Sequence, residues 1–292
     1  MTQDMKTIVI DNDTGIDDSV AILAAKKLGI GLDYVVSTAC NTSVHNALVN
    51  NTLLRRYYDM SYKTVAGLDV TIDGKTKSRS NFHGTDGFGE NQTALARHLD
   101  IDIHGIKADY DLDEFKQILG TLDNITYITT GSLSSLAYLI EDENIHIDKI
   151  YSMGGAIMNF TREHDSETNF LSDGLAVMKI LDSNIDWTIF PSDFTYKQLI
   201  DLEFLDNLKD YEYEYIRKNL YFYANKLAKF GLKGVIIHDM YPIIYAASPS
   251  SFEYVDCRLL ANEYGHLEEN ENGRLVHVAN KINEDFIKKI LN

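Results

Sequence analysis

The sequence predicts an α/β fold in which an open, mainly parallel sheet is flanked by helices. Short apolar runs rich in β-branched and aromatic residues alternate with longer segments of helical period over most of the 292 residues. This alternation is typical of βα units, because each helix returns the chain to the edge where the next parallel strand begins. No repeat, low-complexity tract or linker rich in proline and glycine divides the chain, so we expect one domain over residues 1–292.

The first strand is predicted at 6–10, where the sequence reads KTIVI, and a helix is predicted at 16–28. Asp17 and Asp18 fall in the first turn of that helix, where its dipole favours acidic side chains. By the same criteria of β-branched content and apolar periodicity, further strands are predicted at 34–39, 125–130, 149–153, 187–190 and 234–238. Further helices are predicted at 43–59, 112–120, 133–142, 173–182, 196–203 and 210–229.

Polar residues or glycines lie at the carboxyl ends of several predicted strands, namely Asp11, Asn41, Gly131, Gly154 and Asp239. In an open parallel sheet, ligands bind in the crevice beyond the carboxyl ends of the strands. We therefore expect these positions, which are remote in sequence, to approach one another. His238 and Asp239 thereby become candidate neighbours of the acidic stretch that begins at Asp11.

The formal net charge of −17 argues against nucleic acid and anionic membranes as partners, because binding to phosphate groups requires a basic surface. Cys40 and Cys257 lie far apart without a CxxC spacing, so neither a zinc cluster nor a disulfide framework is predicted. The first residues, MTQDMKT, lack the basic and apolar regions of a secretory signal. No apolar run approaches the ~20 residues that span a bilayer. We expect a cytoplasmic protein.

Four aspartates, Asp11, Asp13, Asp17 and Asp18, lie close together between the first strand and the first helix. Like charges at this spacing raise one another's pKa, so such a cluster takes up protons or binds a cation. Capping of the helix would explain one or two of the carboxylates and leave the others repelling one another. The loop offers only oxygen ligands, which suit Ca²⁺ or Mg²⁺ and not zinc. We interpret it as a site for a hard divalent cation.

Six segments, in order along the chain, resemble the motifs of the nucleoside hydrolases, the ribohydrolases related to inosine-uridine-preferring enzymes. DNDTGIDD at 11–18 is similar to the DxDxGxDD signature of this family. The other segments are HGTDGFG at 83–89, TGSLSSLA at 130–137, MGGA at 153–156, ETNFLSD at 167–173 and IHDMYPIIYA at 237–246. Asn41 also matches an asparagine that the family carries after its second strand. The common order of these matches makes chance a poor explanation.

The resemblance implies a nucleoside-hydrolase-like fold with a Rossmann-like core and one Ca²⁺ deep in the active site. Asp13, Asp18 and Asp239 would coordinate the ion, together with the main-chain carbonyl of Thr130, and Asp11 would lie against the site. Independently of the resemblance, three carboxylates around one divalent cation are far less costly than three around none.

The implied activity is hydrolysis of the N-glycosidic bond of ribonucleosides to the free base and ribose, in nucleoside salvage. Asp13 would accept a proton from a metal-activated water. His238, whose imidazole titrates near the working pH, would protonate the leaving base. The substrate-binding residues implied by the resemblance are Asp17, Asn41, Glu167 and Asn169 at the ribose hydroxyls, Met153 beside the sugar and His83 near the pocket.

A tyrosine-rich stretch at 211–223 precedes the HD pair, and in this family residues of that region help to close the pocket over the base. Most of these aromatic residues are expected to pack on the core, and Tyr221 and Tyr223 are the candidates for contact with a nucleobase. The resemblance also implies a homodimer or homotetramer. It leaves the preference for purine or pyrimidine bases open.

Two other functions fit part of the pattern. A haloacid-dehalogenase-like phosphohydrolase would use the spacing of Asp11 and Asp13, but Gly15 occupies the position where that motif has threonine or valine. A non-catalytic, Ca²⁺-dependent nucleoside-binding protein would keep the metal and ribose ligands without a base or an acid. Because both Asp13 and His238 are present, we expect a hydrolase.

Overall fold

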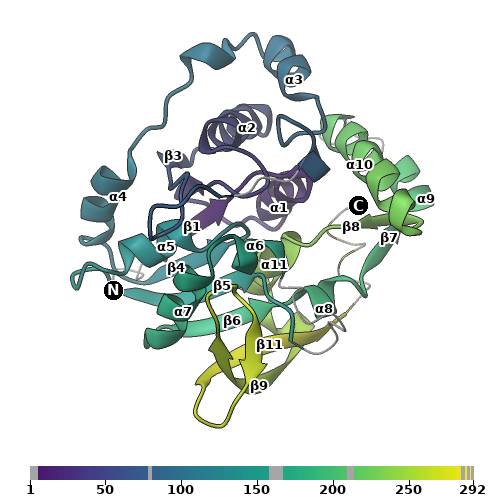
Figure 1. The fold of residues 1–292 in the computed structure, drawn as a ribbon. Coiled ribbons are helices and arrows are strands. Elements are labelled where there is room, and N and C mark those ends of the chain that lie inside the picture. Colours follow the sequence, from purple (N-terminus) through teal and green to yellow (C-terminus); the bar gives the residue numbers. More distant parts are fainter. Residues whose placement is uncertain are drawn as a thin grey trace.

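A nine-stranded sheet forms the centre of the computed structural model, which describes residues 6–77, 81–157, 167–208 and 214–283, together with residues 287 and 290. The strand order is β10-β9-β11-β6-β5-β4-β1-β2-β3 (Figure 1). The bounds are β1 (Thr7–Asn12), β2 (Tyr34–Ser37), β3 (Lys63–Ala66), β4 (Ile125–Thr129), β5 (Ile147–Met153), β6 (Asp186–Phe190), β9 (Phe252–Ala261), β10 (Leu267–Glu269) and β11 (Arg274–Ile282). Neighbouring strands are parallel from β3 to β11, and β9 and β10 continue the sheet in antiparallel pairing. This confirms the predicted α/β fold with a mainly parallel sheet.

Helices connect most of the parallel strands. Their bounds are α1 (Ile16–Lys27), α2 (Val44–Tyr57), α3 (Gln92–His98), α4 (Leu112–Leu119), α5 (Ser134–Leu139), α6 (Thr168–Ser172), α7 (Gly174–Asp182), α8 (Ser192–Thr195), α9 (Leu202–Asn207), α10 (Glu214–Leu227) and α11 (Met240–Ala247). None of these helices, over the described ranges, has both the length and the apolar character that crossing a bilayer requires.

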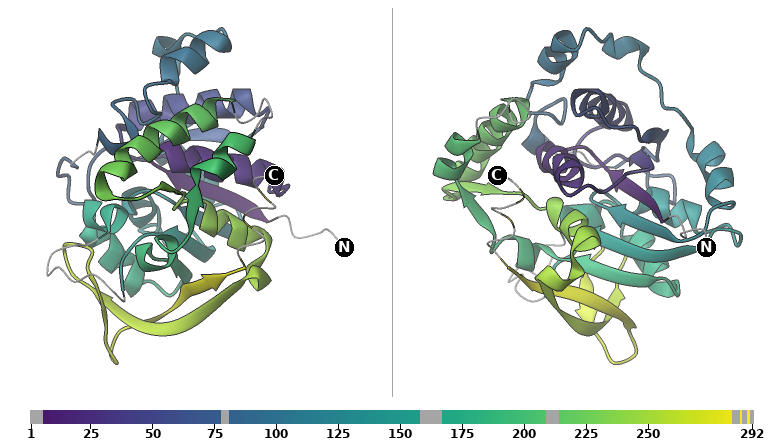
Figure 2. Two further views of the ribbon diagram at one scale, coloured as in Figure 1. Left: turned by 90° about the vertical axis from the view of Figure 1, so that its right-hand side faces the viewer. Right: turned by 180° about the vertical axis from the view of Figure 1, so that it is seen from behind.

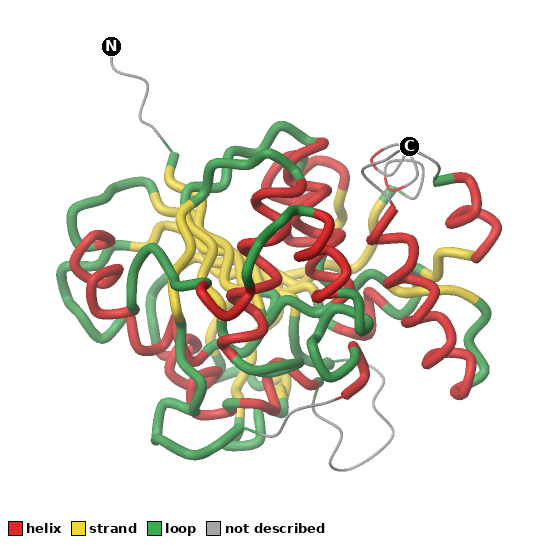
Figure 3. The backbone as a smooth tube through the Cα atoms, turned by 90° about the horizontal axis from the view of Figure 1, so that it is seen from above, coloured by secondary structure: helices red, strands yellow, loops and turns green. Residues whose placement is uncertain are grey.

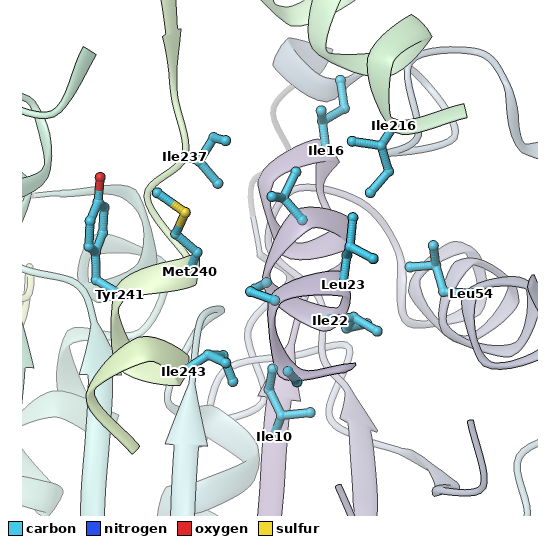
Figure 4. Close-up of a cluster of buried hydrophobic side chains, with 14 of the residues drawn as sticks. Ile10, Ile16, Ile22, Leu23, Leu54, Ile216, Ile237, Met240, Tyr241 and Ile243 are labelled. Atoms are coloured by element: carbon cyan, nitrogen blue, oxygen red, sulfur yellow. The ribbon is translucent and has the colours of Figure 1, made fainter. Parts of the chain in front are cut away.

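The residues of β1 alternate between the two faces of the sheet. Ile8 and Ile10 pack with the cluster that includes residues of α1, α2, α10 and α11, whereas Val9 packs with residues of α4, α5 and α7. Because helices cover both faces, β4 is buried along its whole length and β1 from Ile8 onward. Figure 3 shows helices on either side of the strands. In the first of these clusters, α1 lies between α11 and α2 (Figure 4).

Most predicted elements are confirmed with shifts of a few residues at their ends. The strand predicted at 234–238 forms as β8 (Gly234–Ile236), but it lies outside the main sheet and pairs antiparallel with β7 (Leu199–Asp201). The HD pair at 238–239 therefore reaches the carboxyl edge of the main sheet from a small sheet beside it, and not from one of its parallel strands.

The prediction of a helix at 196–203 is wrong. Leu199 pairs with Ile236 in the β7–β8 sheet, and α9 starts only after Asp201, whose Oδ1 accepts a hydrogen bond of 2.7 Å from the Phe204 N–H. Pairing with a remote strand thus outweighs the local apolar period. The helix predicted at 210–229 is α10, and the stretch before it with Tyr211 and Tyr213 lies outside the described residues.

Strands β3, β7, β9, β10 and β11 and helices α3, α6, α8 and α11 were not predicted. In Figure 2, β9 and β11 form a long pair at one edge of the molecule, and β11 also pairs in parallel with β6. Much of β9 is exposed on both of its faces, including Tyr254 and Val255. The apolar–polar alternation that marks a half-buried strand is therefore missing from this sequence.

Candidate active site

The acidic loop runs from the end of β1 to the start of α1 and is tightly folded. Thr14 adopts a φ of 28°, which is strained for a β-branched residue. Gly15 is required by close approach, because a side-chain carbon there would lie 2.7 Å from Asn41 Nδ2 and 3.0 Å from His83 Nδ1. The Asp18 Oδ2 atom accepts a hydrogen bond of 2.6 Å from the Gly15 N–H. This contact caps α1 and fixes the Asp18 carboxylate.

Three buried carboxylates, those of Asp17, Asp18 and Asp239, each offer an oxygen atom, and these atoms lie within 4.8 Å of one another. Burial raises the pKa of Asp18 and Asp239 well above the ordinary value, and the charges of neighbouring aspartates raise it further. Asp17 Oδ1 and Asp11 Oδ1 are buried without a hydrogen-bond partner in the described part of the chain. Buried, unpartnered oxygens of this kind fit a hard divalent cation.

Asp13 lies close enough to this group for its charge to raise the pKa of Asp18 and Asp239. Its Oδ2 accepts a hydrogen bond of 2.5 Å from the Asn41 N–H, and its Oδ1 accepts one of 3.1 Å from Asn41 Nδ2. Burial is the main reason why the pKa of Asp13 is raised. Asp13 is not one of the three carboxylates that meet within 4.8 Å, so its roles as a ligand and as a base stay predictions.

A cavity of about 360 Å³ opens above the carboxylates, beyond the carboxyl ends of the central strands. Its lining includes these predicted residues: Asp17, Asn41, His83, Thr130, Met153, Glu167, Asn169, Tyr223, His238 and Asp239. Asp13 and Asp18 lie deeper and are fully buried. The structure therefore brings the predicted residues together around one cavity.

The side of the cavity that the prediction assigns to ribose is held by a local network. Glu167 caps α6 and accepts hydrogen bonds from the N–H groups of Asn169 at 2.9 Å and Gly155 at 3.0 Å. Burial nevertheless raises the pKa of Glu167 to about 7. Asn169 Nδ2 donates to the carbonyl oxygens of Thr130 at 2.9 Å and Met153 at 3.3 Å. The amide thus fixes the carbonyl that is predicted to bind the metal.

His238 contacts α8, the short helix after β6. The Thr195 hydroxyl donates to the Ser192 carbonyl at 3.2 Å and lies 2.7 Å from His238 Nδ1. Because the Thr195 hydroxyl proton is donated to the Ser192 carbonyl, we infer that Thr195 Oγ1 accepts a hydrogen bond from His238 Nδ1–H. The free lone pair of the His238 ring is then on Nε2. Burial lowers the pKa of His238 to about 4, against the opposing charge of Asp17. The imidazole is therefore neutral at neutral pH, and the expectation that it titrates near the working pH is wrong, because burial disfavours the charged ring.

His83 faces the cavity from the segment 81–89. Its Nδ1 accepts a hydrogen bond of 3.0 Å from the Ile16 N–H, so this atom has no proton to share with Asp17 Oδ1 at 3.7 Å. The ring stacks on Tyr223 with centroids 5.2 Å apart. His83 is thus held beside the cavity, and within the described ranges no hydrogen bond from its Nε2–H is seen.

Several lining residues were not predicted, namely Phe82, Thr168, Ser192, Tyr196 and Leu227. Phe82 directly precedes the HGTDGFG segment, which is the only local signal for it. Tyr196 packs edge-on against His238 with centroids 5.1 Å apart and is 51% exposed, and nothing in its sequence context points to the cavity. Of the two tyrosines predicted near a base, Tyr223 lines the cavity, whereas Tyr221 donates a hydrogen bond to Asp206 instead.

The fold and this site define an α/β enzyme with an acidic cavity for a small molecule. The sequence model of the inosine-uridine preferring nucleoside hydrolase family matches residues 8–289, and the chain belongs to this family. It is a nucleoside hydrolase, as the resemblance of its motifs implied.

Relatives and solved structures agree with this assignment. The chain is 27% identical over 267 residues to the probable uridine nucleosidase 2 of Arabidopsis thaliana, and this alignment covers 87% of this chain and 81% of that protein. It is 22% identical to the non-specific ribonucleoside hydrolase RihC of Escherichia fergusonii, over 88% of this chain and 84% of that protein. The solved structure of a purine-preferring ribonucleoside hydrolase from Gardnerella vaginalis has a TM-score of 0.84 at 19% identity, over 98% of this chain and 96% of that chain.

Proposed function

We propose that the cavity hydrolyses the N-glycosidic bond of ribonucleosides to the free base and ribose with the help of a bound Ca²⁺. The observation that carries the proposal is the meeting of Asp17, Asp18 and Asp239 at one side of a cavity that also has aromatic walls. Such a cavity suits a ligand that joins a hydroxylated sugar to a flat base. Membership of the family supports this reaction class.

The ligands that we propose for the Ca²⁺ are Asp13, Asp18, Asp239 and the carbonyl of Thr130. Asp17 would lie in contact with these ligands. When bound, a divalent cation lowers the pKa of a water by several units and so supplies a nucleophile at neutral pH. Ca²⁺ accepts an irregular set of carboxylate and carbonyl oxygens more readily than Mg²⁺, which demands near-octahedral geometry.

In this proposal Asp13 accepts the proton of the attacking water. The two hydrogen bonds from Asn41 hold the Asp13 carboxylate, and each oxygen keeps a further lone pair that can take the proton. Asp17, Asn41, Glu167 and Asn169 bind the ribose hydroxyls. These contacts accelerate the reaction because they bind the flattened, oxocarbenium-like sugar of the transition state more tightly than the sugar of the bound substrate.

His238 protonates the leaving base through Nε2 in this proposal. Its low pKa means that the resting imidazole is neutral. The Nε2 proton therefore comes from solvent: as negative charge develops on the departing base, Nε2 takes a proton from a water molecule, the resulting hydroxide is neutralised in bulk solvent, and Nε2 passes the proton to the base nitrogen. Tyr196, Phe82 and Tyr223 provide faces on which the base stacks, a contact that contributes ~1–3 kcal/mol per base.

We further expect a cytoplasmic homodimer or homotetramer that acts in nucleoside salvage, with the chain forming one domain. The strongly negative net charge argues against nucleic acid or an anionic membrane as a partner.

A substrate panel tests the proposed function. Free ribose is measured by a reducing-sugar assay with inosine, adenosine, guanosine, uridine and cytidine, with Ca²⁺ present and phosphate absent. We expect release from at least one nucleoside, and loss of that release on chelation. Nucleosides that bind by calorimetry but release no ribose would support the non-catalytic binding protein instead. The ranking of the five bases measures the preference of the pocket.

A further inference from the structure

Lys77 is a buried lysine whose charge is felt by the acidic site, and no sequence pattern predicted a role for it. Its side chain is almost fully buried, with the residue 4% exposed. The ammonium Nζ donates to the Ala39 carbonyl at 3.1 Å, the Leu68 carbonyl at 3.4 Å and Ser132 Oγ at 2.6 Å. Within the described part of the chain Lys77 forms no ion pair, so three neutral oxygens satisfy its three donors.

Two of these contacts connect Lys77 to the loops that hold the catalytic candidates. Ala39 stands two residues before Asn41, which binds both oxygens of Asp13. Ser132 follows Gly131, which packs so closely on Asp13 that a side-chain carbon there would lie 3.1 Å from Asp13 Cβ. Lys77 thus holds the loop after β2 against the loop after β4, directly behind the carboxylates.

A buried ammonium without a charged partner costs several kcal/mol unless nearby charges offset the loss of hydration. Burial lowers the pKa of Lys77, and the neighbouring Cys40 and three aspartates act against this shift. The charges of Asp11 and Asp13 both favour the charged form of Lys77, and Lys77 in turn favours ionised Asp11. The charge of Asp173 also favours the charged form of Lys77, and the Asp173 carboxylate accepts a hydrogen bond of 2.6 Å from Ser134.

We propose that the Lys77 ammonium is a fixed counter-charge for the acidic cluster, which the loops carrying Asn41 and Thr130 hold in place. It offsets part of the repulsion among the carboxylates when no cation is bound. For the same reason it weakens the hold of the cluster on a divalent cation. Lys77 is therefore a positioning residue that touches neither substrate nor metal.

The first test uses metal-free protein and does not depend on the proposed function. In a chelating buffer at pH 9, above the pKa of about 8 to which burial raises Asp11, the melting temperature is measured for wild type, Lys77→Met, Asp11→Asn and the double variant. We expect Lys77→Met to lower Tm by about 5–10 °C alone and by less than half of that in the Asp11→Asn background. Lys75→Met removes an exposed lysine paired with Asp73 and should shift Tm little in either background.

Equal Tm losses from Lys77→Met in both backgrounds would overturn the proposal, because they would indicate lost packing and hydrogen bonds alone. If Lys77→Met does not fold, recovery of folded protein in the double variant supports the proposal, and failure of both contradicts it.

The second test rests on the proposed metal site. Calorimetric titration with Ca²⁺ should give a Kd for Lys77→Met about tenfold lower than for wild type and Lys75→Met, because one repelling positive charge is gone. Unchanged or weaker binding by folded Lys77→Met would contradict the counter-charge. Absence of Ca²⁺ binding by wild type would instead refute the proposed metal. The comparison of melting temperatures among wild type, the two single variants and the double variant would still decide the role of Lys77.

Discussion

Asp18 and Asp239 come from opposite ends of the chain and meet in one buried group, where the pKa of both carboxyl groups is raised. A cation relieves the repulsion and restores the charged forms. We therefore predict that Asp18→Asn and Asp239→Asn each weaken Ca²⁺ binding by at least about 100-fold in calorimetric titrations.

Asp123→Asn is the matched control, because Asp123 is exposed and lies outside the cavity lining. It makes the same change in net charge and should leave the Kd within about twofold of wild type. Equal losses of affinity in all three variants would indicate a general charge effect and contradict a specific site.

His238 allows a prediction about pH. Its folded pKa of about 4 lies below the ordinary value of 6.5, so the unfolded chain binds the proton more tightly. The contribution of neutral His238 to the unfolding free energy is fully present above pH 6.5 and is lost as pH falls towards 4. Between pH 7 and pH 4 we expect wild type to lose roughly 3 kcal/mol more unfolding free energy than His238→Gln.

Urea denaturation of the metal-free proteins at both pH values measures this difference. Carboxyl groups with raised pKa values act in the opposite direction, but they are common to both proteins and cancel in the comparison. Identical pH dependence of wild type and His238→Gln would show that His238 is not held neutral by burial.

At the scale of elements, the small β7–β8 sheet sets the position of His238 and Asp239. Gly234 in β8 lies against the Ile200 carbonyl, and a side-chain carbon there would come within 2.2 Å of that oxygen. We predict that Gly234→Ala shifts β8 and lowers kcat/KM at least about tenfold, while circular dichroism still reports a folded protein. Gly31→Ala, where the added carbon meets open space, should keep wild-type kcat/KM, and equal activity of both variants would contradict this role of β8.

The elements that could be predicted from the sequence are those whose local pattern agrees with their burial. Strand β1 has Ile8, Val9 and Ile10 buried on both faces, which reads as a continuous apolar run. The stretch at 196–203 has a helical period, but the pairing of Leu199 with Ile236 depends on a strand that is remote in sequence. No local pattern carries that information.

At the scale of the whole molecule, the candidate site could be predicted only because its motifs resemble a family. The sequence pattern alone placed His238 and Asp239 near Asp11. It had no signal for Thr195, which contacts His238, or for Lys77, because their partners are contacts between loops that only the folded chain creates. The single domain over 1–292 stays a prediction.

The assembly can be predicted at the same scale. A homodimer or homotetramer should elute with a light-scattering mass of two or four times the 33.1 kDa of one chain. The charge of −17 repels other copies, so we expect the mass at 0.15 M salt to be kept or raised at higher ionic strength. A mass of one chain at micromolar concentration and moderate salt would contradict the predicted assembly.

The measurement that tests the acidic cavity as a hydrolytic centre most directly is the rate of ribose release by wild type and Asp13→Asn, both with Ca²⁺ and without phosphate. The best nucleoside of the panel serves as substrate, and circular dichroism confirms that both proteins are folded. We predict measurable release by wild type and a loss of 10²–10⁴-fold in kcat for Asp13→Asn, as expected for removal of a general base. No release by wild type, or an unchanged rate in Asp13→Asn, would contradict the assignment.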